Sequence, residues 1–449
     1  MIETALLLNV LFFVGVILFL ATHRYMNVYS GIFVYAIFHF VVFVQRPILV
    51  YLFDMRTVFE HLTYFPTPGE FVHTLFVADF GFLSFTFFYL AALRFTSVTP
   101  NFNPPVIGYS ERAAFGVTLV ILGPLILYSF FLAFTVRQAY GGEVLDQLGQ
   151  LNLQVDPATG QLLYVDSTAY IVDARNFALP FATLLIVMQR GRWWSWPPLL
   201  LCALVSLQVG TRWPLVISVL VTIFLATYLR KRRFFEIKHY MLMAPALFAF
   251  VVVGQNRDAL VKLLLTGNFD LNFDLSQSSF GDHPDFAMFD CLSYVLAKVP
   301  AVSGTYSYFT QYLGLFTQAI PRALWPDKPV GSPIMLVNLD AYGKFSPYVP
   351  TLVGDGWISL GYAGVIITTG LVGAFYGWLY RRFCRGTPSI YFFCAYFLIL
   401  ALLLQWARDG GYGIITNFFF FCIGPILLAY GVGRVSFKRP REFLPKQSQ

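Results

Sequence analysis

Long runs of apolar residues, separated by short polar segments, follow one another along most of the chain. A run of about 20 apolar residues is long enough to cross the hydrocarbon core of a bilayer, which is roughly 30 Å thick. The pattern therefore predicts an all-α polytopic membrane protein with about eleven transmembrane helices. The predicted helices cover residues 4–21, 30–53, 71–94, 113–136, 169–189, 197–210, 213–229, 240–255, 356–380, 388–406 and 412–433.

Three further local signals accompany these windows. Pro47 lies inside the second window, where it removes a backbone donor, so we expect a kink or an interruption there. Only Gly210–Arg212 separates the sixth window from the seventh, which predicts a tight helical hairpin. The first window begins directly after Glu3, with no basic region before it and no small-residue cleavage site after it. We interpret it as a retained first helix rather than as a signal peptide that is removed.

The composition agrees with a membrane protein. Hydrophobic residues make up 57% of the chain and charged residues 12%, whereas a soluble domain typically has about 25% charged residues. The net charge of +7 is compatible with nucleic-acid binding, but the basic residues gather in short loops between the apolar windows. That distribution is typical of the positive-inside rule rather than of a nucleic-acid surface, so no nucleic-acid partner is predicted.

The loop charges also predict an orientation. Most Lys and Arg residues fall on one side of the predicted helices, and the acids among them are Glu111, Glu236 and Glu442. This side is predicted to be cytoplasmic, which places the N-terminus in the periplasm and the C-terminus in the cytoplasm of a bacterial inner-membrane protein. The chain then divides into eight helices over 1–255, a large periplasmic loop over 256–355, three helices over 356–433 and a basic cytoplasmic tail over 434–449.

The large predicted loop contains two apolar stretches that polar residues interrupt, Met288–Val302 and Tyr306–Leu324. We expect these stretches to form amphipathic helices lying on the outer membrane interface, where their Tyr and Trp residues are well accommodated. An alternative is that they form two further transmembrane helices. Two extra crossings would leave the predicted orientation unchanged.

A row of arginines falls at the predicted periplasmic ends of the helices. A charge at membrane depth costs about 2.5–3.5 kcal/mol, so each needs a partner or a function. The rigid guanidinium fork suits phosphate and carboxylate oxygens, which predicts an anionic site such as one for a lipid-linked diphosphate. The alternative is pairing with lipid headgroups and with nearby acids such as Asp173, Asp258 and Asp409. The arginines are Arg46, Arg175, Arg212, Arg257, Arg322 and Arg408.

Candidate acid/base residues lie on the same predicted side. Asp355 precedes the ninth window and is a candidate general base for a sugar hydroxyl, or alternatively an acid that satisfies the N–H groups of the first helical turn. His283 is the candidate histidine, although a solvated loop histidine is the simpler interpretation. The acidic stretch 270–290 matches no calcium-loop spacing, so neither a metal nor a cofactor is predicted. Asp79, inside the third window, is interpreted as a hydrogen-bonded structural group.

The large predicted loop contains the segment Gln318–Pro329, with the letters QAIPRALWPDKP. This segment resembles the Ile-Pro-x-x-Leu-Trp-Pro-x-Lys/Arg-Pro segment of the Wzy-type oligosaccharide repeat-unit polymerases, which include O-antigen and enterobacterial-common-antigen polymerases. The resemblance extends to Val209–Arg212 at the hairpin tip, to Ser346–Gly354 before the ninth window and to Ala407–Gly410 before the last. It covers about residues 200–425 in matching order. The family diverges widely, and other membrane glycosyl-transferring proteins share its outline.

This resemblance implies a metal-independent, all-helical membrane glycosyltransferase with a GT-C-like fold. Such enzymes transfer a growing glycan from one undecaprenyl diphosphate onto a new lipid-linked repeat unit, with a Wzz-type chain-length regulator as a partner. The resemblance also implies that the periplasmic arginines are diphosphate ligands. Of these, Arg212 and Arg408 match the motifs most closely. Relatives vary at Asp355. Sugars stack on aromatic faces, which suits Trp325, although anchoring in the aromatic belt is an equal alternative.

Two other functions remain open at this point. An O-antigen ligase performs similar chemistry but transfers the glycan to the lipid A core, and it is expected to use a motif histidine that His283 does not match in context. A non-enzymatic transporter of lipid-linked sugars is expected to carry charged groups near the bilayer midplane on broken helices. The arginines here gather at one face instead, which favours glycosyl transfer.

Overall fold

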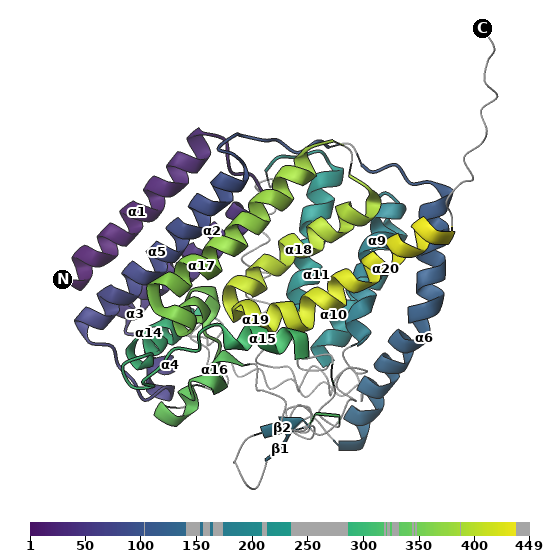
Figure 1. Cartoon of the computed structure of the whole chain (residues 1–449). Coiled ribbons are helices and arrows are strands. Elements are labelled where there is room, and N and C mark those ends of the chain that lie inside the picture. The colour runs from purple at the N-terminus through teal and green to yellow at the C-terminus, as the bar shows by residue number, and fades with distance from the viewer. Residues whose placement is uncertain are drawn as a thin grey trace, which may run out of the picture.

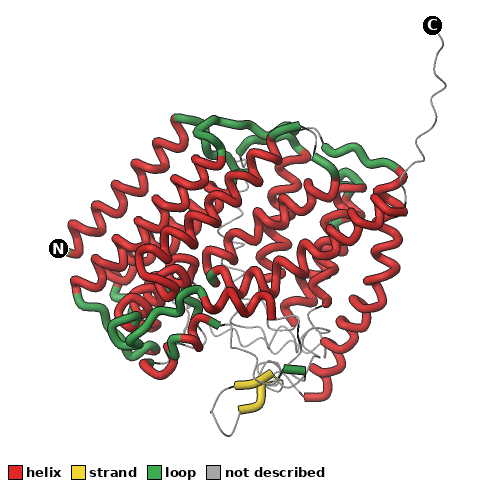
Figure 2. The backbone as a smooth tube through the Cα atoms, in the orientation of Figure 1, coloured by secondary structure: helices red, strands yellow, loops and turns green. Residues whose placement is uncertain are grey.

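Helices make up most of the described chain, and most of them lie side by side in one bundle (Figure 1). Loops gather at the two ends of these helices (Figure 2). A short antiparallel strand pair, β1 (Leu153–Val155) and β2 (Leu162–Tyr164), lies at one end of the bundle. The structure, a computed structural model, describes residues 1–102, 104–140, 153–155, 162–164, 174–208, 213–234, 286–317, 320, 324–325, 332–343, 345, 348–386 and 388–436.

Six of the described helical segments are long and apolar enough to cross a membrane. Each overlaps one of the predicted windows, so the prediction of a helical membrane protein is confirmed. The six are α1 (Ile2–Thr22), the continuous segment Gly31–Phe53, α5 (Pro68–Ala92), α6 (Tyr109–Tyr140), α17 (Thr351–Cys384) and α18 (Ile390–Asp409).

Shorter apolar helices occupy four more of the predicted windows, whereas the window at 240–255 lies outside the described residues. These are α9 (Ala178–Met188) with the preceding η2 (Ala174–Phe177), α10 (Pro197–Gln208), α11 (Trp213–Leu229) and α20 (Phe420–Ser436) with the preceding η7 (Ile414–Phe419). The connecting elements are α4 (Thr57–His61), η3 (Trp193–Ser195), α14 (Met288–Lys298), α15 (Thr310–Thr317), α16 (Pro333–Leu336), η6 (Leu339–Tyr342) and α19 (Gly411–Gly413).

The segment Gly31–Phe53 is interrupted where the sequence predicts it. α2 (Gly31–His39) passes into a π-helical turn, η1 (Phe40–Gln45), which is followed by α3 (Arg46–Phe53). Pro47 lies in the first turn of α3, where its ring excludes the carbonyl four residues earlier and its missing N–H leaves one bond unmade. A widened π turn accommodates both effects without ending the helix.

The described loops that carry many of the basic residues lie at one end of the bundle, which we call the basic face (Figures 1 and 2): 23–30, 93–102, 104–108, 189–196, 230–234, 385–386 and 388–389. Tyrosine hydroxyls connect the loop 93–102 to a neighbouring loop and to α17. Tyr25 donates to the carbonyl of Phe95 at 2.8 Å, and Tyr380 donates to that of Val98 at 3.0 Å. The opposite end, which holds α4, α14, α15 and α16, we call the site face (Figure 1).

The ninth predicted helix differs in shape from the prediction, because α17 folds back on itself. Its backbone leaves the helical region at Leu360 and Gly361, where Gly361 has a φ of +57°. A Cβ placed on Gly364 would clash with the carbonyl of Gly356, which shows that residues 351–359 pack against the start of the long arm. Backbone N–H groups of the loop 307–308 donate to two carbonyls that the break exposes, those of residues 358 and 359.

The prediction that Met288–Val302 forms an amphipathic helix on the membrane interface is wrong. α14 covers Met288–Lys298, and all of its residues from Met288 to Leu296 are buried. It packs against α17, α5 and η1 inside the site face, and the indole of Trp357 on α17 donates to the carbonyl of Val299 at 2.7 Å. The second stretch fits the prediction better, since Leu313 and Phe316 of α15 are exposed.

α5 and the long arm of α17 form the closest helix pair of the bundle core. A Cβ on Gly373 or on Gly377 would clash with the carbonyl oxygens of Phe85 or Tyr89 on α5. Glycines four residues apart remove side chains from one stripe of a helix, so that two backbones can approach closely in a lipid environment. This contact holds the long arm of α17 directly against the backbone of α5.

Candidate functional site

Asp355, on the short arm of α17, is the centre of a buried polar cluster on the site face. Its side chain is 1% exposed. One carboxylate oxygen accepts a hydrogen bond from the hydroxyl of Tyr312 at 2.6 Å and from the backbone N–H of Gly411 at 2.9 Å. The other oxygen accepts from the side-chain amide of Gln311 at 3.0 Å. The carboxylate therefore joins three segments, α15, α17 and α19, through charge-assisted hydrogen bonds.

The groups around Asp355 are themselves held in place. The amide of Gln311 also donates to the hydroxyl of Ser359 at 2.7 Å, and its oxygen accepts from the hydroxyl of Ser307 at 2.8 Å. Burial, and then the charge of Asp355, raises the pKa of the Tyr312 phenol well above its ordinary value, so the phenol stays a donor at neutral pH. A network with its members satisfied is rigid. The geometry favours a positioning role for Asp355.

Asp355 does not have the helix-start role that the sequence left open as an alternative. It accepts no hydrogen bond from the first turn of its own helix. Instead, the hydroxyl of Thr351 accepts from the backbone N–H of Gly354 at 3.1 Å. The N–H that reaches Asp355 belongs to Gly411, which is 56 residues further along the chain.

The turn that follows α18 reaches Asp355 because it contains two glycines. Gly410 has φ +83° and ψ 178°, a backbone conformation that is essentially restricted to glycine. A Cβ on Gly410 would lie 3.1 Å from the Cβ of Asp355, and one on Gly411 would clash with the hydroxyl of Tyr312. The Gly410–Gly411 pair thus lets the end of α18 close onto the carboxylate.

Replacing Gly410 with alanine is expected to destabilise the protein by about 1–3 kcal/mol, because alanine must adopt a strained backbone conformation against Asp355. Thermal unfolding in detergent measures the change. Gly424→Ala is the matched control, since no atom lies within 4 Å of its added Cβ and alanine stabilises a helix interior by roughly 0.5–1 kcal/mol. Equal melting temperatures for the two variants would contradict this account of the turn.

Arg408 and Asp409 form the last turn of α18, directly before Gly410. Arg408 Nη1 lies 3.3 Å from one carboxylate oxygen of Asp409, and the side-chain amide of Gln405 donates to the other oxygen. The side chain of Arg408 is 34% exposed and that of Asp409 is 17% exposed. The site face therefore presents a guanidinium that is anchored by a carboxylate yet accessible, next to the Asp355 cluster.

Arg46, another of the predicted diphosphate ligands, is buried and paired with groups of the protein itself. Its guanidinium lies 2.5 Å from a carboxylate oxygen of Asp290 and also donates to the carbonyl of Met55 at 3.2 Å. Both members of this ion pair are buried, with 1% and 0% of their side chains exposed. Asp290 belongs to the acidic stretch 270–290 of the predicted periplasmic loop, and its side chain is buried rather than exposed to solvent. The pair joins the kinked second span to α14.

Arg46 and Arg408 approach α14 from different parts of the chain. Burial raises the pKa of the Cys291 thiol, the charge of Asp290 raises it further, and Arg408 and Arg46 both lower it. The two guanidinium groups are therefore within electrostatic range of one residue, Cys291. The sequence predicted both at one membrane level; in the structure Arg46 contacts α14 through Asp290, and Arg408 acts on α14 electrostatically.

The remaining predicted site residues are described only in part. Arg175 is buried in η2, with 4% exposed, and its backbone N–H donates to the hydroxyl of Ser129 at 2.9 Å. Trp325 is 37% exposed. Four predicted residues, Arg212, Arg257, Arg322 and His283, lie outside the described residues. Among the three predicted arginines that the structure describes, Arg408 is the accessible one.

Asp79 makes the hydrogen bonds of a structural group, as predicted. Its Oδ1 accepts from the side-chain amide of Asn9 on α1 at 2.9 Å and lies 3.2 Å from Nε2 of His39 on α2. The His39 ring also stacks on Phe82 with a centroid distance of 4.4 Å. This polar contact links three of the helices that are able to span the membrane.

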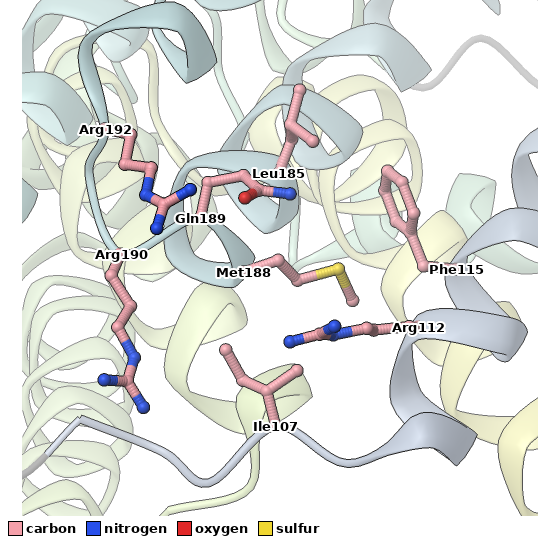
Figure 3. Close-up of a pocket in the computed structure, with 8 residues that line it drawn as sticks. All are labelled: Ile107, Arg112, Phe115, Leu185, Met188, Gln189, Arg190 and Arg192. Atoms are coloured by element: carbon pink, nitrogen blue, oxygen red, sulfur yellow. The ribbon is translucent and has the colours of Figure 1, made fainter.

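A cavity of about 520 Å³ opens on the basic face, at the other end of the bundle from Asp355. Arg112 extends into it from α6 toward Met188, and Arg190 and Arg192 line it from the segment that follows α9 (Figure 3). Neither Asp355 nor Arg408 lines this cavity. The described residues thus place an accessible cationic cavity and the packed Asp355 cluster at opposite ends of the molecule.

Tyr312 and Gln311 are site-face residues that the sequence analysis missed, and it did not predict the burial of Asp290. Their only signal was polar residues that interrupt the apolar stretches 288–302 and 306–324. Comparison of the chain with protein-family models, with curated proteins and with solved structures gave no match.

Proposed function

We propose that this chain is a membrane glycosyltransferase that polymerises undecaprenyl-diphosphate-linked oligosaccharide repeat units at the periplasmic face of a bacterial inner membrane. One observation supports the proposal most strongly. Two of the segments that resemble Wzy-type polymerases, Ser346–Gly354 and Ala407–Gly410, meet at the Asp355 cluster, although more than 50 residues separate them in the sequence. Gly410 faces both Asp355 and the carbonyl of Thr351.

In the proposed reaction, the bond between the anomeric carbon of the growing glycan and its diphosphate oxygen breaks. A hydroxyl oxygen of the acceptor sugar forms the new glycosidic bond, and its proton passes to a base. The diphosphate leaves as an anion, so it needs stabilisation of negative charge rather than a proton. We assign this role to Arg408, which is accessible and oriented by Asp409, and to the predicted ligands Arg212, Arg257 and Arg322.

Asp355 serves this chemistry indirectly. Asp355 is 1% exposed and three donors engage its oxygens, so it holds the α18–α19 turn and an acceptor hydroxyl does not reach it. Asp409 is the partly exposed carboxylate beside Arg408, and we assign the acceptor proton to it. His283, the other candidate, lies outside the described residues.

Deleting the gene is expected to abolish long glycan chains while leaving lipid A core that carries single repeat units. The electrophoretic ladder of surface glycan from the host, with and without the gene, measures this. The same experiment separates the alternatives. Loss of a ligase would leave long chains on the undecaprenyl lipid and none on lipid A core, and loss of a transporter would remove single units as well. An unchanged ladder, or either of these patterns, would contradict the polymerase proposal.

A further inference from the structure

A second cavity on the basic face, of about 690 Å³, lies where the ends of α5, α17, α18 and α20 converge. It is at the opposite end of α17 from Asp355. Its wall carries an unusual concentration of positive charge, contributed by segments that are far apart in the sequence. The guanidinium groups come from Arg94, Arg381, Arg382, Arg385 and Arg434.

These five arginines have no acidic partner within the described part of the chain, where no carboxylate oxygen lies within 4.0 Å of any of their nitrogens. Arg381 Nη1 donates to the carbonyl of Ala92 at 3.3 Å, and Arg94 and Arg385 are close enough to interact with it electrostatically. Like charges held together repel one another, and a bound anion relieves that repulsion.

Aromatic rings give the same cavity an apolar side. The guanidinium of Arg382 lies 5.3 Å from the ring centre of Phe392, and that of Arg434 lies 4.7 Å from the ring centre of Tyr430. Such cation–π contacts orient the guanidinium groups. Trp378, which is 52% exposed, also lines the cavity. An indole at a helix end is typical of the interface between headgroups and acyl chains.

We propose that this cavity binds the phosphate headgroup of an anionic phospholipid, with its acyl chains against Trp378 and Phe392. Basic pockets between helix ends recognise headgroups in this way. The arginines alone would suit any phosphate, but the exposed indole of Trp378 has no role toward a soluble anion. The inference does not depend on the proposed glycosyl transfer.

Native mass spectrometry of the purified full-length protein, titrated in detergent with short-chain phosphatidylglycerol, tests the proposal. We expect one phosphatidylglycerol to bind more tightly than the rest, and phosphatidylcholine of the same chain length to bind at least tenfold more weakly. The double variant R385Q/R434Q is expected to weaken that site by about tenfold to thirtyfold, because each arginine near a lipid surface contributes about fivefold.

R24Q/R230Q is the matched control, since it removes two exposed arginines from the same face that do not line the cavity. Equal weakening by both double variants, or no weakening by R385Q/R434Q, would overturn the proposal. Inorganic phosphate provides the other arm of the experiment. If it displaces phosphatidylglycerol at a similar concentration, the cavity is a soluble-phosphate site and the assignment to lipid is wrong.

Discussion

Replacing Arg408 with alanine is expected to reduce the rate of glycan polymerisation by at least about a hundredfold while the protein still inserts and folds. Removing one preorganised donor to a developing anion typically costs a factor of about 10² to 10³ in rate. Arg408 is the accessible guanidinium among the predicted arginines that the structure describes. Its Nη1 pairs with a carboxylate oxygen of Asp409 at 3.3 Å. Chain-length distribution on lipid-linked glycan, measured with purified enzyme, reports the effect.

Arg56→Ala is the matched control for Arg408. Arg56 lies on the same face and pairs with Asp54 at 2.5 Å, but both side chains are more than half exposed. An exposed ion pair contributes only about 0–1 kcal/mol to stability, so this variant is expected to behave like the native protein. Normal chain length in Arg408→Ala, or the same loss in Arg56→Ala, would refute the assigned site.

Replacing Asp290 with alanine is expected to destabilise the protein by about 3–5 kcal/mol, because the substitution leaves the guanidinium of Arg46 buried without its charge partner. The pair is 244 residues apart in sequence and holds α14 against the kink of the second span. Thermal unfolding in detergent, together with the yield of inserted protein, measures this loss. A melting temperature unchanged in Asp290→Ala would show that the pair contributes little.

The double variant Arg46→Met with Asp290→Leu separates the charge from the packing. Replacing both members of a buried pair by apolar residues is often neutral, so most of the lost stability should return. Its activity is equally informative. Normal polymerisation by the double variant would remove Arg46 from the set of diphosphate ligands, whereas loss of activity in a stable double variant would return Arg46 to it.

The transmembrane spans were predictable because the signal for a span lies within a single stretch of sequence. A window of apolar residues needs no knowledge of its neighbours to be recognised, and the π turn before Pro47 follows from one missing N–H. Burial of α14 was not predictable in this way. An alternation of polar and apolar residues indicates that a helix has two faces, but not what covers the polar one. For Asp290 the covering group is Arg46 from the second span.

The candidate site was predictable as a set of residue types but not as a geometry. Asp355 and Arg408 both stood out as charges beside apolar windows. Their connection runs through Gly410 and Gly411, whose importance lies in a backbone conformation and a missing Cβ. The sequence did not mark Tyr312 as a hydrogen-bond partner of Asp355, since a tyrosine in an apolar stretch is equally typical of membrane-interface anchoring.

The break at Leu360 and Gly361 separates Asp355 from the part of α17 that responds to the thickness of the bilayer. Asp355 lies on the short arm of α17, whereas the long arm, after Gly361, spans the bundle. Helices adjust their tilt to the hydrocarbon thickness around them. We expect the break to absorb such adjustment, so that host lipids of different chain length leave the Asp355 hydrogen bonds intact.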